Sequence, residues 1–432
     1  MSDLTIILLF IILIIILIIS GLPLFVCFAV ACMGMMKVFD LGTDFAIPVI
    51  FTNLNSFTLM AIPFFVLSGS LMAKSKMSGK IVDFVNNIVG RIKGGLGLVV
   101  IVSCGFYGAI TGSSGAAITA IGPAILPELD RYGYDRRYST ALLACAGLLG
   151  QLIPPSIPLI LFGMITSTSI AACWLSTVIP GLLLILFYGI INYFFCRKNT
   201  KIIETREISF NKIMSSARSG FFSLLMPVVV LGGIYGGLFT PTEGAAVGVI
   251  YALLVGFIIY RNLSVRDFFS VTIESVSVLG SFYFIIMFIL ILSRIFTLEQ
   301  LPVILAESML KVSSNRIVIL LLINVMLLIV GMLMDDISSM LVCAPLLFPL
   351  FIKLGVNPLQ MAAILAVNQG TGMLTPPVAT NLFMASRVGK VPIAEFLRYT
   401  IPYLLLGNIP VLLMVTFIPQ LSIWLPQLVF GR

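Results

Sequence analysis

The stretch GQLIPPSIPLILFG, residues 150–163, places two adjacent prolines inside a chain that otherwise has the composition of membrane helices. Each proline removes a backbone donor and fixes φ, so the pair should break any helix that contains it. A second such stretch, GMLTPPVATNLFMA, follows at residues 372–385. The sequence therefore predicts a membrane protein in which the same dipeptide interrupts two hydrophobic spans.

The composition of the whole chain supports this interpretation. The 432 residues are 60% hydrophobic and 10% charged, with a mean hydropathy of +1.17, whereas a soluble chain carries about 25% charged residues. Apolar runs longer than about 18 residues recur, which predicts an all-α polytopic membrane protein. The runs are continuous and do not alternate, which excludes a membrane β-barrel. The N-terminal run lacks a basic start and a cleavage site, so we expect a first membrane helix there.

The residue types that the chain contains or lacks also limit its possible functions. The seven cysteines are scattered without paired spacing, which favours small packing residues over disulfides or metal ligands. No histidine occurs, so the commonest metal ligand and general base are missing. A phosphate-binding GxxxxGK[ST] motif, as an ATP-driven pump needs, is also absent from the sequence. The net charge is +8, and the basic residues lie in short loops between the apolar spans. This distribution is typical of the cytoplasmic loops of a membrane protein and does not indicate nucleic-acid binding.

The two proline stretches belong to an internal repeat. At a fixed separation of 222 residues, Pro154 and Pro155 match Pro376 and Pro377. Over residues 121–163, ten positions are identical to their counterparts without a gap, where membrane-like composition gives roughly three or four by chance. The chain therefore contains two copies of one plan.

The loop charges indicate how the two copies are oriented. The segment 74–93 is strongly basic, but its counterpart 294–316 is nearly balanced; after the breaks, 167–172 is uncharged whereas 387–398 is basic. Because basic loops stay on the cytoplasmic side, matching loops should lie on opposite faces of the membrane. This predicts an inverted repeat, which is typical of secondary transporters.

The predicted layout has a first repeat at 1–196, a cytoplasmic linker at 197–218 and a second repeat at 219–432. In the first repeat we expect helices near 4–20, 22–37 and 46–72, an arm at 75–93, a re-entrant hairpin at 94–131 entering from the cytoplasm, a broken helix at 137–166 and a crossing at 173–196. In the second we expect helices at 219–239, 241–260 and 268–293, an arm at 296–315, an outer hairpin at 317–352 and a broken helix at 358–386.

Each hairpin carries a polar break at its tip. The repeat matches Ser113 and Ser114 in the first tip with Asp335 and Asp336 in the second. Non-helical backbone inside a membrane is tolerated only where it is buried in protein or lines a polar cavity. Carboxylates this far inside an apolar region indicate a functional site. For the first tip, ordinary packing of small residues remains an alternative.

Hydroxyls, carboxylates and freed carbonyls are hard oxygen ligands, so we predict two Na⁺ sites related by the repeat. The first would use oxygens at the first tip and its broken helix: Ser113, Ser114, Gly147, Gly150 and Pro154. The second would use oxygens at the second tip and its broken helix: Asp335, Asp336, Gly370, Gly372, Thr375 and Pro376.

A single arginine stands apart from the basic loops. Arg294 closes the apolar run SFYFIIMFILILSR and has no basic counterpart in the first repeat. It is either a snorkelling residue at a helix end or a planar partner for a substrate carboxylate. Ser113, Ser167 and Thr168 are further candidates for contacts to substrate hydroxyls.

Four segments together resemble one known family: GSSGAAITAIGPAILPELDRYGYDRR (112–137), GLLGQLIPPSIPLILFG (147–163), GGLFTPTEGAAVGVIYALLVG (236–256) and TPPVATNLFMAS (375–386). Over nearly its whole length the chain resembles the large membrane subunit of tripartite ATP-independent periplasmic (TRAP) transporters, the DctM-like family. In that family Asp335 and Asp336 match an acidic hairpin tip, and Arg294 matches an arginine of sialate-type members.

The resemblance implies an elevator-type ion-transporter architecture and Na⁺-driven uptake of an organic acid: a C4-dicarboxylate, a sialic acid or a related sugar acid. The implied partners are a small four-helix membrane subunit, expected as a separate DctQ-like chain, and a periplasmic substrate-binding protein. The implied location is the lipid bilayer of the bacterial inner membrane. A stand-alone Na⁺/carboxylate symporter of similar architecture is the alternative. A membrane enzyme is disfavoured, since no acid/base set exists beyond Asp335 and Asp336.

Overall fold

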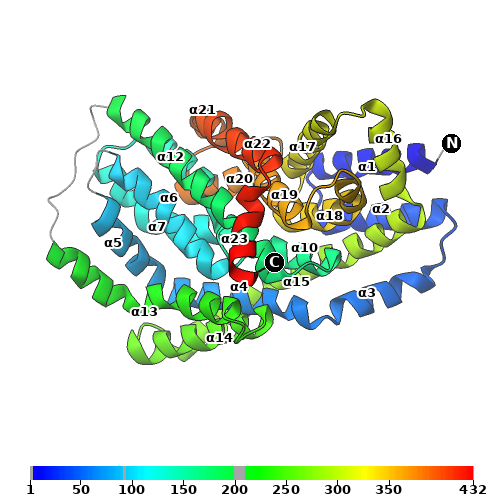
Figure 1. Cartoon of the computed structure of the whole chain (residues 1–432). Coiled ribbons are helices and arrows are strands. Elements are labelled where there is room, and N and C mark those ends of the chain that lie inside the picture. The colour runs from blue at the N-terminus through cyan, green and yellow to red at the C-terminus, as the bar shows by residue number, and fades with distance from the viewer. Residues whose placement is uncertain (1–2, 91–93, 199–209, 432) are drawn as a thin grey trace.

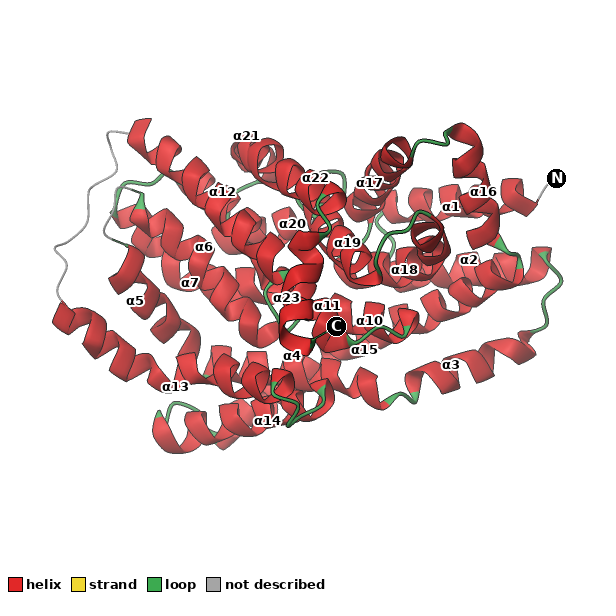
Figure 2. Ribbon diagram, in the orientation of Figure 1, coloured by secondary structure: helices red, strands yellow, loops and turns green. Residues whose placement is uncertain are grey.

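The computed structural model describes residues 3–90, 94–198 and 210–431. In this part of the chain every regular element is a helix (Figures 1 and 2). Nine helical segments of the described residues are long and apolar enough to cross a membrane, which confirms the prediction of an all-α polytopic membrane protein. Most of the predicted linker 197–218, together with the end of the arm 75–93, lies outside the described residues.

The first repeat contains, in chain order, α1 (Asp3–Ile19), α2 (Leu24–Val38), η1 (Thr43–Phe45), α3 (Ala46–Leu54), η2 (Phe57–Met60), α4 (Ala61–Lys74), α5 (Met77–Val89), α6 (Gly95–Thr111), α7 (Ser114–Arg131), α8 (Arg136–Gly147), α9 (Leu149–Leu152), α10 (Ile157–Thr166), α11 (Ile170–Ser176) and α12 (Val178–Lys198).

The second repeat contains, in chain order, α13 (Phe210–Tyr235), α14 (Pro241–Leu254), η3 (Val255–Ile259), α15 (Val265–Leu298), α16 (Leu301–Val312), α17 (Arg316–Leu333), α18 (Asp336–Lys353), α19 (Pro358–Gly372), α20 (Thr380–Gly389), α21 (Ile393–Tyr403), η4 (Leu404–Asn408), α22 (Ile409–Phe417) and α23 (Gln420–Phe430).

One predicted helix, 46–72, was wrong because the structure divides it. α3 ends at Leu54, and the backbone of Ser56 is extended before η2 and α4 begin. The side chain of Asn53 donates to the Val49 carbonyl at 2.8 Å. Short polar side chains that hydrogen-bond nearby backbone compete with the helix ladder, and three of them fall together here.

The counterpart of this divided helix in the second repeat is continuous. α15 is a single helix of 34 residues. The residues that match Asn53, Asn55 and Ser56 are Ser275, Ser277 and Val278, so the polar cluster is weaker. A Ser264–Asp267 capping box also fixes the start of α15. The two repeats therefore differ in one long element.

Both expected tips are breaks between paired helices. α6 and α7 pack against each other and are joined at Gly112, whose φ of +65° suits glycine. α17 and α18 are joined through Met334 and Asp335, both in extended conformation.

Both proline pairs interrupt their helices. After α9 the backbone is non-helical until α10 begins at Ile157, and after α19 it is non-helical until α20 begins at Thr380. Both bonds within the pairs, Pro154–Pro155 and Pro376–Pro377, are cis. The same interruption therefore occurs in both repeats.

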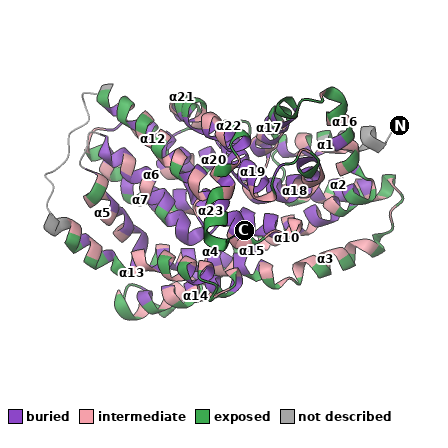
Figure 3. Cartoon of the chain, in the orientation of Figure 1, coloured by how far each residue is buried: buried purple, intermediate pink, exposed green. Residues whose placement is uncertain are grey.

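The interrupted helices occupy the buried middle of the molecule. α10 packs against α18, α18 against α19, and α6 against α9. Burial is greatest on these elements: every residue from Tyr138 to Gly147 on α8 and from Gln360 to Gly372 on α19 is buried (Figure 3). α4 and α15 pack against one another and contact α6 and α18, respectively. α4 and α15 therefore lie against one helix of each hairpin.

Candidate functional site

The first tip contacts the first broken helix through backbone. The amide of Ile157 donates to the Gly112 carbonyl at 3.2 Å. A Cβ on Gly150 would lie 2.7 Å from the carbonyl oxygen of Ser113, and one on Gly108 would lie 2.5 Å from the Cα of Gly150. Glycine is therefore needed at both 108 and 150 for this approach.

The second tip contacts the second broken helix in the same way. The amide of Val378 donates to the Met332 carbonyl at 3.1 Å. A Cβ on Gly372 would overlap the backbone of Gly331. The hydroxyl of Thr375 donates to the Thr371 carbonyl at 3.1 Å. Each tip thus lies against the broken helix of its own repeat.

The two broken helices also meet each other. The side-chain amide of Gln151 donates to the Ala366 carbonyl at 3.4 Å, and a Cβ on Gly370 would overlap the Leu148 side chain. The two predicted oxygen sets are therefore joined through one buried interface.

The residues of the first predicted oxygen set gather around the start of α7. Ser113 is its N-cap and accepts from the amide of Ala116 at 3.4 Å, and Ser114 is buried. A Cβ on Gly147 would lie 3.4 Å from the Ser114 carbonyl oxygen. Pro154 is in the interrupted stretch, and its neighbour Pro155 places a carbonyl 2.8 Å from the Cβ position of Gly112.

The second predicted set contains a buried carboxylate with unused acceptor capacity. Asp335 holds the N-cap position of α18 but makes no capping hydrogen bond. Both of its carboxylate oxygens are buried without a well-formed hydrogen bond, although Ser338 lies close enough to interact. Asp336 differs, because its Oδ1 accepts from the Ile337 amide at 3.0 Å. An unpaired buried carboxylate is costly unless a cation compensates for it.

More buried polar atoms without hydrogen bonds lie on the helices that flank the second break. They include the Ser338 hydroxyl, Asn368 Oδ1, both amide atoms of Gln369, the Thr380 hydroxyl and both amide atoms of Asn381. Each such group costs about 1–3 kcal/mol when it is left unpaired, and such groups are rare in native proteins. This concentration indicates a ligand site.

Sequence reasoning missed the side chains of Asn368, Gln369 and Asn381. Polar amides next to a proline pair inside an apolar span were the available signal.

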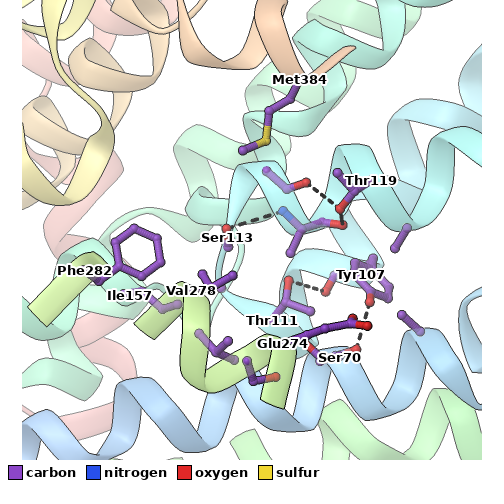
Figure 4. A pocket seen from close by; sticks show the side chains of 18 of the residues that line it. Ser70, Tyr107, Thr111, Ser113, Thr119, Ile157, Glu274, Val278, Phe282 and Met384 are labelled. Atoms are coloured by element: carbon purple, nitrogen blue, oxygen red, sulfur yellow. Dashed lines mark hydrogen bonds between the residues drawn. The ribbon is translucent and has the colours of Figure 1, made fainter. Parts of the chain in front are cut away.

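A cavity of about 360 Å³ opens beside both tips (Figure 4). Its walls come from α4, the end of α6, the start of α7, α15 and the start of α18, with Ile157 of α10 and Met384 of α20. Ser113 and Asp336 line it, so the structure brings one residue of each tip to the same space. The charged residues among its lining are Asp336 and Glu274, and none of the lining residues is basic.

Arg294 lines a different cavity, of about 440 Å³, with residues of α3 and the last turn of α10. It is the one charged residue among that cavity's lining, and it makes no ion pair with a described carboxylate. Glu274 and Arg294 are 20 residues apart on α15, or about 30 Å along the axis. The structure therefore separates Arg294 from Ser113.

Ser167 and Thr168 lie just beyond the α10 residues of the Arg294 cavity. Ser167 ends α10 in the left-handed conformation with φ of +53°. The Thr168 hydroxyl accepts from the Thr166 hydroxyl at 2.9 Å. Neither residue is part of the lining of either cavity.

Comparison with known proteins identifies the family. Residues 9–421 match the family described as tripartite ATP-independent periplasmic transporter, DctM component. The chain is 35% identical to the C4-dicarboxylate TRAP transporter large permease protein DctM of Pseudomonas aeruginosa, covering 88% of each chain. It is 34% identical to the sialic acid TRAP transporter large permease protein SiaM of Vibrio cholerae, covering 95% of this chain and 96% of that one.

A third relative is longer than this chain. The isethionate TRAP transporter permease protein DctMQ of Oleidesulfovibrio alaskensis is 33% identical over 94% of this chain, which spans 64% of that relative. Among solved structures, the Alcanivorax borkumensis YdaH transporter shares the fold with a TM-score of 0.59 and 15% identity, covering 90% of each chain. These relatives are transporter permeases, and the chain belongs to the DctM family of TRAP transporter large permease subunits, multi-pass proteins of the bacterial inner membrane.

Proposed function

We propose that this permease couples Na⁺ entry to the uptake of a small organic acid. The observation that carries the proposal is the paired contact of tip and broken helix: Gly112 with Ile157 at 3.2 Å, and Met332 with Val378 at 3.1 Å. Two equivalent non-helical junctions in one membrane protein provide oxygen ligands and half-helix ends in a buried setting. This arrangement suits simultaneous binding of a cation and an anion.

Na⁺ is the proposed coupling ion because the available donors are hard oxygens. Asp335 supplies a buried carboxylate that lacks a well-formed hydrogen bond, and Ser338 supplies a buried hydroxyl. No cluster of three or more His, Cys, Asp or Glu occurs in the described residues, and a monovalent ion needs none. Backbone carbonyls of Gly370, Gly372 and Pro376 with the Thr375 hydroxyl would complete the second site.

The first Na⁺ site is proposed around the first tip. Its ligands would be the hydroxyls of Ser113 and Ser114 and the carbonyls of Gly147, Gly150 and Pro154. Backbone contact between the tip and α9 supports this arrangement. Because the repeat gives this site no carboxylate, it should bind Na⁺ more weakly than the site at Asp335.

In the proposed transport movement, the tips and broken helices move along the axis of α15. The cavities lined by Arg294 and Glu274 lie at different levels along that helix, and α10 contributes its first residue to one and its last turn to the other. The loop charges predict that the Arg294 end is outside. In an elevator mechanism the tips and broken helices move along α4 and α15, so the substrate would meet Arg294 on entry and the Glu274 end before release.

The proposed partners are those that the family description implies. A tripartite periplasmic transporter needs a periplasmic substrate-binding protein and, beside the large permease, a small four-helix membrane subunit. The printed names of the relatives give isethionate, C4-dicarboxylate and sialic acid as their substrates, and all three are small organic anions. An organic acid is therefore the substrate class proposed for this chain.

Transport by reconstituted components tests this function. Proteoliposomes holding the chain and its small subunit, with the binding protein outside, should accumulate the acid only under an inward Na⁺ gradient. Replacing Na⁺ by choline, or omitting the binding protein, should abolish uptake. Equal uptake without Na⁺ would reject the coupling, and full uptake by the chain alone would make it a stand-alone symporter.

A further inference from the structure

The cavity beside the tips has an electrostatic character that an acid-binding site does not ordinarily have. Two carboxylates line it, Asp336 from α18 and Glu274 from α15, without a basic residue among the lining. An anion placed between them would be repelled from both walls. A small organic acid can bind here only with its carboxylate at one defined end.

Three hydroxyls of the lining, two on α6 and one on α7, already donate to backbone carbonyls. The Tyr107 hydroxyl donates to the Gly69 carbonyl at 3.0 Å, and the Thr111 hydroxyl donates to the Tyr107 carbonyl at 3.3 Å (Figure 4). The Thr119 hydroxyl likewise donates to the Gly115 carbonyl at 2.9 Å. A hydroxyl has one proton, so these three oxygens offer the cavity only lone pairs.

Glu274, on α15, adds a strong acceptor to the lining. Its Oε1 accepts from the Ser270 hydroxyl of the same helix at 3.2 Å. It forms no ion pair with any basic residue that the structure describes. A carboxylate has about four lone-pair positions, so most of its capacity faces the cavity and solvent.

The first tip can donate hydrogen bonds. The Ser113 oxygen accepts from the Ala116 amide at 3.4 Å, which leaves its proton free. The adjoining first turn of α7 presents backbone N–H groups, which favour an anion. The cavity therefore has donors at the first tip, and on its α15 side it has the Glu274 carboxylate next to the buried Ser275 hydroxyl.

We propose that Glu274 is a specificity-determining residue of this transporter. It accepts a hydrogen bond from a hydroxyl at the far end of a substrate whose carboxylate lies at the first tip, and it repels a substrate with a second carboxylate there. The favoured class is a hydroxylated monocarboxylic acid, and the disfavoured class is a dicarboxylic acid. Binding sites commonly achieve specificity by attracting the favoured ligand and repelling its competitor. This rests on the proposed function, because it takes the cavity as the acid site.

Three six-carbon acids that differ only beyond their first carboxylate test the inference. D-gluconate carries hydroxyls, adipate a second carboxylate, and hexanoate neither. Na⁺-dependent thermal stabilisation of the purified full-length permease in lipid nanodiscs gives an apparent affinity for each. Gluconate should bind at least about tenfold more tightly than adipate, on the scale of a charge-assisted hydrogen bond and a like-charge repulsion.

In the variant Glu274→Gln, gluconate should bind only about threefold more tightly than adipate, or less. The glutamine amide removes the negative charge but keeps one hydrogen-bond acceptor. Hexanoate affinity should stay within about twofold of wild type, which a merely structural loss would not allow. The matched control is Glu299→Gln, at the C-terminal end of the same helix and outside both cavity linings; it should leave the ratio unchanged.

The outcomes separate the inference from the proposed function. If all three acids bind but Glu274→Gln leaves the gluconate-to-adipate ratio unchanged, Glu274 does not determine specificity and the inference is wrong. A wild-type preference for adipate would also overturn it. If none of the acids stabilises the wild type in Na⁺, the cavity is not an acid site and the proposed function fails with the inference.

Discussion

At the scale of single residues, Asp335 and Arg294 are opposite cases. Asp335 is a carboxylate whose oxygens are buried and lack well-formed hydrogen bonds, so we propose a cation as its counterpart. Arg294 is an exposed guanidinium lining a cavity, without an ion pair to a described carboxylate. Water can solvate Arg294, so its charge does not need a bound anion for compensation as strongly as the charge of Asp335 needs a cation. The two residues therefore need different tests.

Removing the charge of Asp335 should weaken Na⁺ binding. For Asp335→Asn we expect the Na⁺ concentration that gives half-maximal uptake to rise about tenfold or more, because a charged oxygen ligand is worth roughly 1.5–3 kcal/mol. Na⁺ titrations of uptake, at equal membrane levels, provide the measurement. Glu307→Gln removes an exposed carboxylate from α16 and should change nothing. An unaltered Na⁺ dependence of Asp335→Asn would contradict the assignment.

Replacing Arg294 by lysine keeps the charge but removes the planar donor pair. If Arg294 binds the substrate carboxylate, Arg294→Lys should lower uptake at limiting substrate by a factor equivalent to roughly 1–3 kcal/mol. The initial rate at low substrate, compared with wild type, is the readout. An arginine that only snorkels tolerates lysine, so uptake within about twofold of wild type would assign Arg294 to that role.

At the scale of elements, close glycine contacts hold each tip against its broken helix. The contact between Gly372 and Gly331 leaves no room for a Cβ. These contacts are between backbones, which cannot move aside as a flexible side chain can. They therefore fix the distance between α17 and α19, which pack along each other.

Adding one methyl group at this contact should destabilise the fold. We expect Gly372→Ala to lower stability by about 1–3 kcal/mol through overpacking, seen as a fall in melting temperature in detergent. Gly232→Ala is the control, because nothing lies within 4 Å of its Cβ position on exposed helix α13. If the two variants melt together, the close approach of α17 and α19 is not tight in solution.

The elements could be predicted from the sequence wherever a strong local cause existed. Proline pairs break helices regardless of their surroundings, so the interruptions near residues 154 and 376 were predictable. The break at Asn55 and Ser56 was not, because short polar residues only compete with a helix, and packing decides the outcome. Glu274 was also missed: a lone acid on a helix has many roles, and only tertiary structure brings it to the same cavity as Asp336.

At the scale of the whole molecule, the inverted repeat predicts the sidedness of the two arm helices. Asp83 on α5 and Glu307 on α16 are both exposed, and the seven native cysteines are buried. On a cysteine-free background, Asp83→Cys should react with an impermeant thiol reagent only from the cytoplasm, and Glu307→Cys only from the periplasm. Labelling of both from the same side would rule out the inversion.

The difference between α15 and the divided α3 and α4 has an energetic consequence. Two identical copies related by inversion would give inward-open and outward-open states of equal free energy, each occupied half the time. In this chain the second repeat has the continuous helix α15 where the first repeat has a break between α3 and α4. The two states would therefore differ in free energy. Under the proposed elevator mechanism, where each 1.4 kcal/mol shifts a two-state population tenfold, a modest difference in this one element would bias the side of the membrane on which the empty carrier waits.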